Sequence, residues 1–132
     1  MNLDLSKDYI MELELALAKR DFSNYEELLK EGHPADLAEI LEKLDFEYAQ
    51  IFYDRIADEV GAEVLMELDE DLRAKILEDY TGKEIAHELI DNLDSDDAAD
   101  LINELNEAQR REVLERIEDQ NQAMDIARLL VY

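Results

Sequence analysis

The sequence predicts an all-α protein, a solenoid of short amphipathic helices that follows an N-terminal helical cap. Apolar residues recur at steps of three and four along most of the chain, as in Leu37, Ile40 and Leu44, and this spacing is typical of helical faces. Glycine and proline, which interrupt helices, number only three and one. No strand-like alternation competes with this pattern. Five aromatic residues at helical spacing are expected in the core: Phe46, Tyr48, Phe52, Tyr53 and Tyr80.

Two helices are expected before the repeating part of the chain begins. The first is predicted over residues 7–20 and the second over residues 22–31. Pro34 then marks a new helix start, because proline is favoured at the first helical position. We therefore predict an N-terminal helical cap, residues 1–31, and a repeating part, residues 32–132, which together make one compact domain.

The repeating part has a period of about 12 residues. Four acidic or amide residues each follow an apolar one, and each can accept hydrogen bonds as the N-cap of the next helix. These candidates are Asp45, Asp69, Asp94 and Asn106. Helix starts are expected near residues 34, 46, 58, 70, 82, 95, 107 and 120, with connections near 45, 57, 69, 81, 94, 106 and 118. Such short helices are marginal alone in water and persist by stacking on their neighbours.

The charge balance limits the classes of partner. There are 37 Asp and Glu residues against 13 Lys and Arg, which gives a formal net charge of -24. Such a polyanion repels nucleic-acid phosphates and gains nothing from an anionic membrane surface. It attracts cations and basic protein surfaces. We expect no nucleic-acid partner, with acidic mimicry of a nucleic acid as the one route that this charge leaves open.

Several kinds of chemistry have no support in the sequence. The chain has no cysteine, so disulfides and thiolate chemistry are excluded. No apolar run approaches the roughly 20 residues of a membrane span, so this segment is not expected to insert into a bilayer. His87 and Glu88 begin a pattern that lacks the second histidine of a zinc-protease helix. We therefore expect no catalytic residues and no enzymatic activity.

Three aspartates are the candidate metal ligands: Asp96, Asp97 and Asp100. If a helix starts near Ser95, the first and the last of them lie on one face and Asp97 flanks them. Like charges at this spacing cost roughly a few tenths of a kcal/mol, which a bound divalent cation would remove. Carboxylate oxygens suit Mg²⁺, yet aspartate is equally favoured in a helix cap and first turn. Both interpretations are open at this point. A second acidic group is interpreted as a capped, solvated first turn: Glu67, Asp69, Glu70 and Asp71.

Two segments carry a family resemblance. They read HPADLAEILEKL at residues 33–44 and LDSDDAADLINEL at residues 93–105. Together they resemble the N-terminal cytosolic domain of the MgtE family of bacterial magnesium channels, over residues 32–132. The resemblance implies a right-handed superhelix of short helices, followed in the parent chain by a pair of CBS domains and a membrane pore. It also implies a location at the cytoplasmic face of the bacterial cell membrane and a full-length homodimer.

The resemblance further implies a magnesium-sensing regulatory role. In that family, Mg²⁺ between the acidic surfaces of the cytosolic domains holds them together and closes the pore. For this chain we expect weak Mg²⁺ binding in isolation, with Asp96, Asp97 and Asp100 as the candidate ligands. The alternative is a helical scaffold for protein–protein interaction, because a similar superhelix occurs in flagellar motor switch proteins. A fold shared in this way does not by itself decide function.

Overall fold

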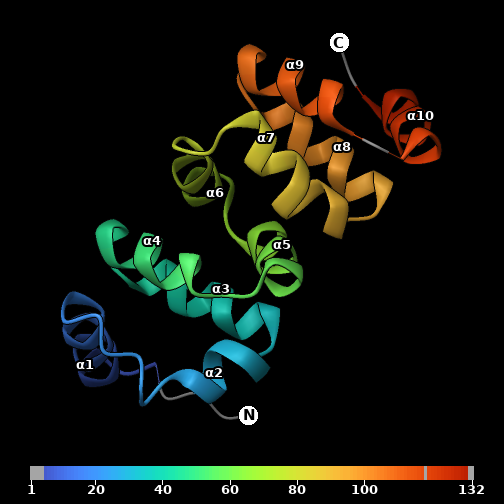
Figure 1. Ribbon diagram of the computed structural model, residues 1–132. Coiled ribbons are helices and arrows are strands. Elements are labelled where there is room, and N and C mark those ends of the chain that lie inside the picture. The colour runs from blue at the N-terminus through green and yellow to red at the C-terminus, as the bar shows by residue number, and fades with distance from the viewer. Residues whose placement is uncertain (1–4, 118, 131–132) are drawn as a thin grey trace. The chain divides into compact units, whose positions relative to one another are not determined.

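The computed structural model describes residues 5–117 and 119–130 (Figure 1). All regular structure in these residues is helical, and no strand occurs among them. The predicted all-α class is therefore confirmed. The right-handed superhelical arrangement stays a prediction, as does the cap.

The helices from residue 34 onward begin where the sequence predicts. Their bounds are α3 Pro34–Lys43, α4 Phe46–Asp54, α5 Asp58–Glu67, α6 Glu70–Leu77, α7 Gly82–Glu84, α8 Ser95–Glu104, α9 Glu107–Arg116 and α10 Gln120–Leu129. After α7 the chain stays helical through a π-helical turn, η1, and a 3-10 turn, η2. These span Ile85–Leu89 and Ile90–Asn92. The connection expected near residue 118 lies outside the described residues.

The two N-terminal helices are shorter than predicted. Helix α1 spans Lys7–Ala18 and α2 spans Glu26–Glu31. Arg20 has a φ of 56°, a left-handed conformation that no α-helix continues through. The next residues form a turn, in which the Asp21 carboxylate accepts hydrogen bonds from the backbone N–H and the hydroxyl of Ser23, at 3.2 and 2.7 Å. This local side-chain bonding competes with helix formation and delays the start of α2.

The contacts divide the chain into two compact units, residues 1–69 and 70–132. In the first unit α1 packs against α4, and α3 packs against both α4 and α5. In the second unit α7 packs against α9, and α8 against α10. Three of these contacts, α3 with α5, α7 with α9 and α8 with α10, join a helix to the next helix but one. The boundary predicted between residues 31 and 32 stays a prediction.

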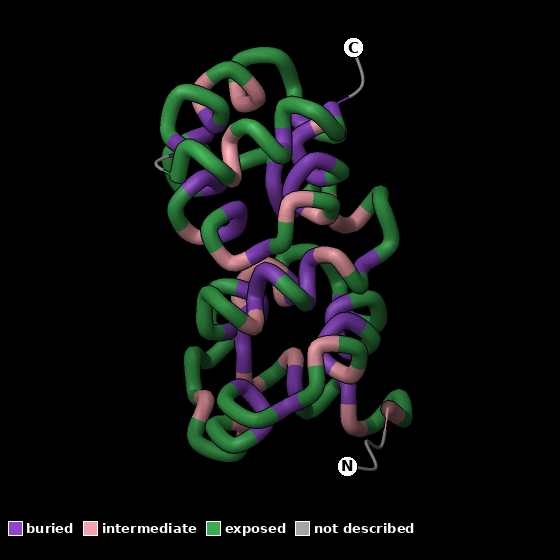
Figure 2. The backbone as a smooth tube through the Cα atoms, turned by 90° about the vertical axis from the view of Figure 1, so that its right-hand side faces the viewer, coloured by how far each residue is buried: buried purple, intermediate pink, exposed green. Residues whose placement is uncertain are grey.

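Each unit buries its own apolar core, and Figure 2 shows how buried positions recur along the helices. In the first unit Leu37, Phe52 and Leu65 are fully buried, and in the second unit Ile85 and Ile102 are. Among the described residues no polar or charged side chain is buried. The stability of the fold therefore comes from apolar contact between short helices, at roughly 25 cal/mol per Å² of apolar surface removed from water.

Two of the predicted N-caps form as expected. Asp94 accepts a hydrogen bond from the backbone N–H of Asp97, at 2.9 Å. Asn106 accepts one from the N–H of Gln109, at 2.8 Å, and the Gln109 side chain accepts from the Asn106 N–H in return. Asp45 stands at the N-cap of α4, but its side chain makes no capping bond. Asp45 therefore occupies the N-cap position, but its side chain does not stabilise the start of the helix by a capping hydrogen bond.

Carboxylates from neighbouring helices stabilise other helix starts. Glu14 on α1 accepts a hydrogen bond from the N–H of Asp45, at 2.9 Å. Glu112 on α9 accepts one from the N–H of Lys83, at 3.1 Å. The first N–H groups of a helix lack intrahelical partners, and an anion there also interacts favourably with the helix dipole. The helices are thus joined at their ends as well as through their apolar faces.

Two glutamine side chains stabilise helix C-termini by donating hydrogen bonds to backbone carbonyl oxygens. The side-chain amide of Gln109 donates to the carbonyl oxygens of Leu77 and Tyr80, at 3.0 and 2.9 Å. The amide of Gln122 donates to those of Ile90 and Leu93, at 3.3 and 3.4 Å. The chain separations are identical in the two sets, 32 and 29 residues. This equivalence is a structural counterpart of the sequence repeat.

Replacing Gln109 with glutamate is expected to lower the free energy of unfolding by about 1–2 kcal/mol. The carboxylate would remove the two donors and set a negative charge against two carbonyl oxygens. Urea denaturation followed by circular dichroism measures the change. Gln122→Glu is the matched control, and its effect should be smaller because its hydrogen bonds are longer. A Gln109→Glu variant as stable as the original chain would contradict this capping role.

Candidate functional site

Helix α8 carries the three candidate ligands, Asp96 and Asp97 in its first turn and Asp100 in its second. It is strongly amphipathic, and its inner face is apolar, with buried residues Ala98, Ala99, Leu101 and Ile102. Asp96 and Asp100 lie on the outer face and are exposed, while Asp97 is half-buried. The sequence spacing thus places the aspartates as expected, with two carboxylates in solvent and one at the edge of the core.

Electrostatic repulsion concentrates at Asp97. Partial burial raises the pKa of its carboxyl above the usual value, because removal from water disfavours the charged form. The negative charges of Asp94, Asp100 and Asp96 raise this pKa further, in that order. A nearby cation would favour the charged form of Asp97 and so lower this pKa.

The cap and ion interpretations of this cluster apply to different residues. Asp94 is the cap, since its carboxylate accepts the N–H of Asp97. The carboxylates of Asp96, Asp97 and Asp100 have no hydrogen-bond or ion-pair partner within residues 5–117 and 119–130. One aspartate is thus committed to folding, and three remain available to solvent ions or to another surface.

The available carboxylates do not converge on one point. In the part of the chain that the structure describes, no three histidine or acidic side chains form a group that could hold a metal ion. Side chains at neighbouring helical positions point in different directions around the axis. Asp96, Asp97 and Asp100 therefore offer the right donor chemistry for Mg²⁺ without a closed coordination shell. Their assignment as ligands stays a prediction.

Replacing Asp97 with asparagine is expected to raise stability at neutral pH by about 0.5 kcal/mol or less. A raised folded-state pKa means that ionisation opposes folding. The penalty is complete above the folded pKa and disappears as the pH falls to the unfolded value near 3.8. The gain from Asp97→Asn should therefore shrink as the pH falls through this interval. Thermal melts at neutral and acidic pH measure it, and a destabilised variant at neutral pH would contradict the assignment.

The other residues considered from the sequence lie apart from this turn. The residues of the second acidic group, Glu67, Asp69, Glu70 and Asp71, are all exposed. His33 is the N-cap residue of α3. His87 lies in the π-helical turn, where its Nδ1 is 3.8 Å from Asp91 Oδ2. A π-helical turn interrupts α-helices locally and is often found at functional sites. Among the residues that the structure describes, no third metal-ligating group joins His87 and Asp91.

One ion pair supports α8 and has no signal in the sequence. Arg73 on α6 donates from Nε to Glu104 Oε2 at 2.7 Å, and its second nitrogen bonds the other carboxylate oxygen. The side chains are only 11 and 24 % exposed. A bidentate pair of this kind is more specific than an ordinary surface ion pair. The two residues are 31 apart, a separation that no local periodicity predicts.

No helix in residues 5–117 or 119–130 combines the length and apolarity needed to cross a bilayer. A family profile described as the MgtE intracellular N domain matches residues 32–132, which is most of the chain. The chain belongs to this family. The resemblance at residues 33–44 and 93–105 is thereby confirmed. A search of the curated proteins finds no match.

The candidate ligands on α8 lie within the region that matches the MgtE N domain. The chain contains the intracellular N-terminal domain of a magnesium transporter. The matched region begins at residue 32 and includes α3 to α10, so α8 and its three available carboxylates lie well inside it.

Proposed function

We propose that this MgtE N domain senses intracellular magnesium and regulates its transporter, with Mg²⁺ at its acidic surfaces favouring the closed state. The observation that carries the proposal is the group of aspartates in the first two turns of α8. There Asp96 and Asp100 are exposed and Asp97 is half-buried, and none of the three carboxylates has a hydrogen-bond or ion-pair partner among the described residues. Partial burial, with the neighbouring negative charges, raises the pKa of the Asp97 carboxyl. The role is regulatory, and no catalytic step is part of it.

The proposed site is completed by a second surface. Mg²⁺ requires near-octahedral oxygen coordination and keeps several of its waters. The first two turns of α8 supply two or three carboxylates that point in different directions around the helix. We infer that water and an acidic face of the CBS domains of the parent chain supply the remaining ligands. Binding to this chain alone is therefore weak, with a dissociation constant on the order of millimolar.

The regulation follows from differential affinity. Without Mg²⁺, acidic faces repel one another and the cytosolic domains separate. With Mg²⁺, shared ions offset the repulsion and populate the compact, closed arrangement, which binds the ion more tightly. Because this chain has a net charge of -24, its repulsion from another acidic face is large at low magnesium. Bound Mg²⁺ reduces this repulsion. The full-length protein would act as a homodimer at the cytoplasmic face of the membrane.

Magnesium chloride is expected to raise the melting temperature of this chain more than sodium chloride at matched ionic strength. Sodium only screens the repulsion between charges, whereas bound Mg²⁺ adds a favourable free-energy term to the native state alone. At ten times the dissociation constant that term is about 1.4 kcal/mol, or roughly 5 °C for a domain of this size. The excess should fall in the Asp96→Asn, Asp100→Asn double variant.

A matched control separates the site from general charge. Glu59 and Glu63 lie four residues apart on α5 and are exposed, so Glu59→Gln with Glu63→Gln removes the same charge from another helix. This control should keep the magnesium excess. Equal shifts with the two salts would leave only screening and would contradict a specific site.

One observation favours the alternative function, a scaffold for other proteins. Met11 and Leu15 are 58 and 57 % exposed and share a face of α1, because they stand four residues apart. Exposed apolar side chains that adjoin one another are a common feature of protein–protein contact surfaces. A scaffold would show no magnesium excess, so the same melting experiment distinguishes the two functions.

A further inference from the structure

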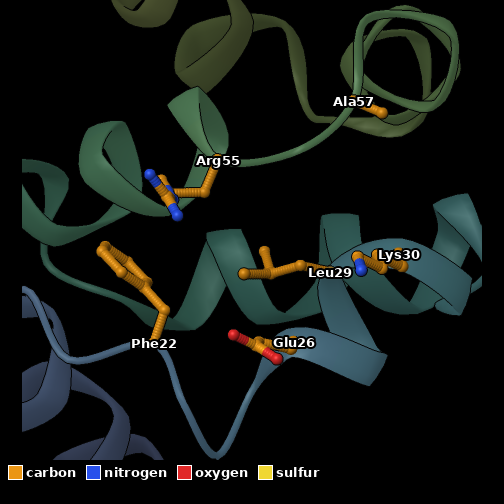
Figure 3. Close-up of a pocket in the computed structure, with 6 residues that line it drawn as sticks. All are labelled: Phe22, Glu26, Leu29, Lys30, Arg55 and Ala57. Atoms are coloured by element: carbon orange, nitrogen blue, oxygen red, sulfur yellow. The ribbon is translucent and has the colours of Figure 1, made fainter.

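A hollow of about 320 Å³ opens on the first unit (Figure 3). This volume is at the lower end of the range of ligand pockets. The wall comes from the turn that follows α1, from α2 and from the connection between α4 and α5. Its residues are Phe22, Glu26, Leu29, Lys30, Arg55 and Ala57.

The position of Arg55 is fixed by an aromatic ring. Its guanidinium carbon lies 4.4 Å from the centre of the Phe22 ring, a cation–π contact. Neither Arg55 nor Lys30 has a hydrogen-bond or ion-pair partner among the described residues. Two cations therefore line one hollow with their donors unused.

The hollow brings two cations together on a strongly acidic chain. With 37 acidic residues and 13 basic ones, basic side chains have many possible internal partners. Lys30 and Arg55 nevertheless share the hollow with a single acidic residue, Glu26. The lining thus has a local positive balance within a strongly acidic molecule, and the in-plane donors of arginine match the geometry of a carboxylate.

The remaining lining adds apolar surface and one acceptor. Leu29 is only 7 % exposed, Phe22 is half-buried, and Ala57 completes the apolar part. Glu26 is exposed and can accept an N–H group. Its charge opposes a dianion such as phosphate more than a single carboxylate. A peptide provides all three matching features: a side-chain carboxylate, an apolar neighbour and backbone N–H donors.

We propose that this hollow binds an acidic peptide segment, with a partner carboxylate on Arg55 and Lys30 and an adjacent apolar side chain on Phe22 and Leu29. The site lies on the first unit and does not depend on the magnesium role proposed for α8. A nucleic acid is a poor occupant, because its continuous row of phosphates would extend beyond the two cations of the hollow onto a chain of net charge -24, whereas a single carboxylate needs only those two cations. The hollow would let a polyanionic domain contact a partner that is itself acidic.

The test is a titration of the full 132-residue chain with a capped Glu-Leu dipeptide, followed by NMR. Signals of the Arg55 side chain and the Phe22 ring should shift and saturate in the millimolar range. A capped Gln-Leu dipeptide, which lacks the carboxylate, and sodium phosphate should each bind at least about tenfold more weakly. Sodium chloride holds the ionic strength constant across all titrations.

Variants identify the residues. Arg55→Gln with Lys30→Gln should weaken binding of the Glu-Leu peptide at least about tenfold, and Arg55→Lys should retain part of it. Lys43→Gln, an exposed lysine of α3 outside the hollow, should leave binding unchanged. Circular dichroism verifies that each variant is folded. Equal binding of Gln-Leu, tighter binding of phosphate, or unaltered binding by the double variant would each overturn the proposal.

Discussion

Replacing Phe52 with alanine is expected to lower the free energy of unfolding by about 3–5 kcal/mol. Phe52 is fully buried in α4 and is among the largest fully buried side chains. Helix α4 packs against α1 and α3, and the truncation would leave a cavity in the core of the first unit. A domain stabilised by about 5–15 kcal/mol in total would lose a large share of its stability.

Urea denaturation measures this loss, and the same helix supplies the control. Phe46 begins α4 but is 37 % exposed, so Phe46→Ala should cost distinctly less than Phe52→Ala. Because the second compact unit has its own core, unfolding is best followed by a probe in residues 1–69. Similar losses in the two variants would contradict the assignment of Phe52 to the centre of the first core.

Replacing Gly82 with alanine is expected to cost about 1–3 kcal/mol, by overpacking. A Cβ at this position would lie 2.5 Å from Glu112 Cβ and 3.0 Å from the backbone oxygen of Gln109. Helix α7 would then have to move away from α9. That movement would also weaken the hydrogen bond from the Lys83 N–H to Glu112. No described glycine has a positive φ, so the cost is steric.

Gly61→Ala is the control for this prediction. A Cβ at Gly61 meets its nearest atom, Tyr53 Oη, at 3.5 Å, which is an ordinary contact. Gly61 lies inside α5, where alanine is favoured over glycine by about 0.5–1 kcal/mol. Thermal melts should therefore show opposite shifts for Gly82→Ala and Gly61→Ala. Shifts of the same sign would contradict the close approach of α7 and α9.

The helix starts could be predicted because their determinants are local. An apolar stripe, a capping residue such as Asp94 or Asn106, and the first-turn proline Pro34 all lie within a few residues of the boundary that they set. The start of α2 could not be predicted in this way. It depends on competition between a helix and the turn formed by Asp21 and Ser23, and the energies of these two conformations are close.

The contacts between helices were less accessible from the sequence. The pair Arg73–Glu104 and the bonds from Gln109 join residues about 30 positions apart, so no helical period relates them. The aromatic residues show the same limit: Phe52 and Tyr53 are buried as expected, whereas Phe46 is 37 % exposed. Spacing identifies a helical face but not how completely a neighbour covers it.

The candidate site was predictable in position but not in geometry. Spacing places Asp96 and Asp100 on the outer face of α8, and the structure agrees. Whether the carboxylates enclose an ion depends on their directions and on a second surface, which the sequence of one helix does not encode. Arg55 and Lys30 were missed because a contact with Phe22 and an absence of ion pairs become visible only in the folded chain.

The most direct test of the central claim is a magnesium titration of this chain at constant ionic strength, followed by backbone amide NMR. We predict that shifts concentrate in residues 94–100, saturate in the millimolar range, and disappear in the Asp96→Asn, Asp100→Asn variant while the Glu59→Gln, Glu63→Gln control retains them. Uniform shifts, or the same response to sodium, would contradict magnesium sensing by α8. Saturation at micromolar magnesium would show a complete site on this chain and contradict a site shared with a second surface.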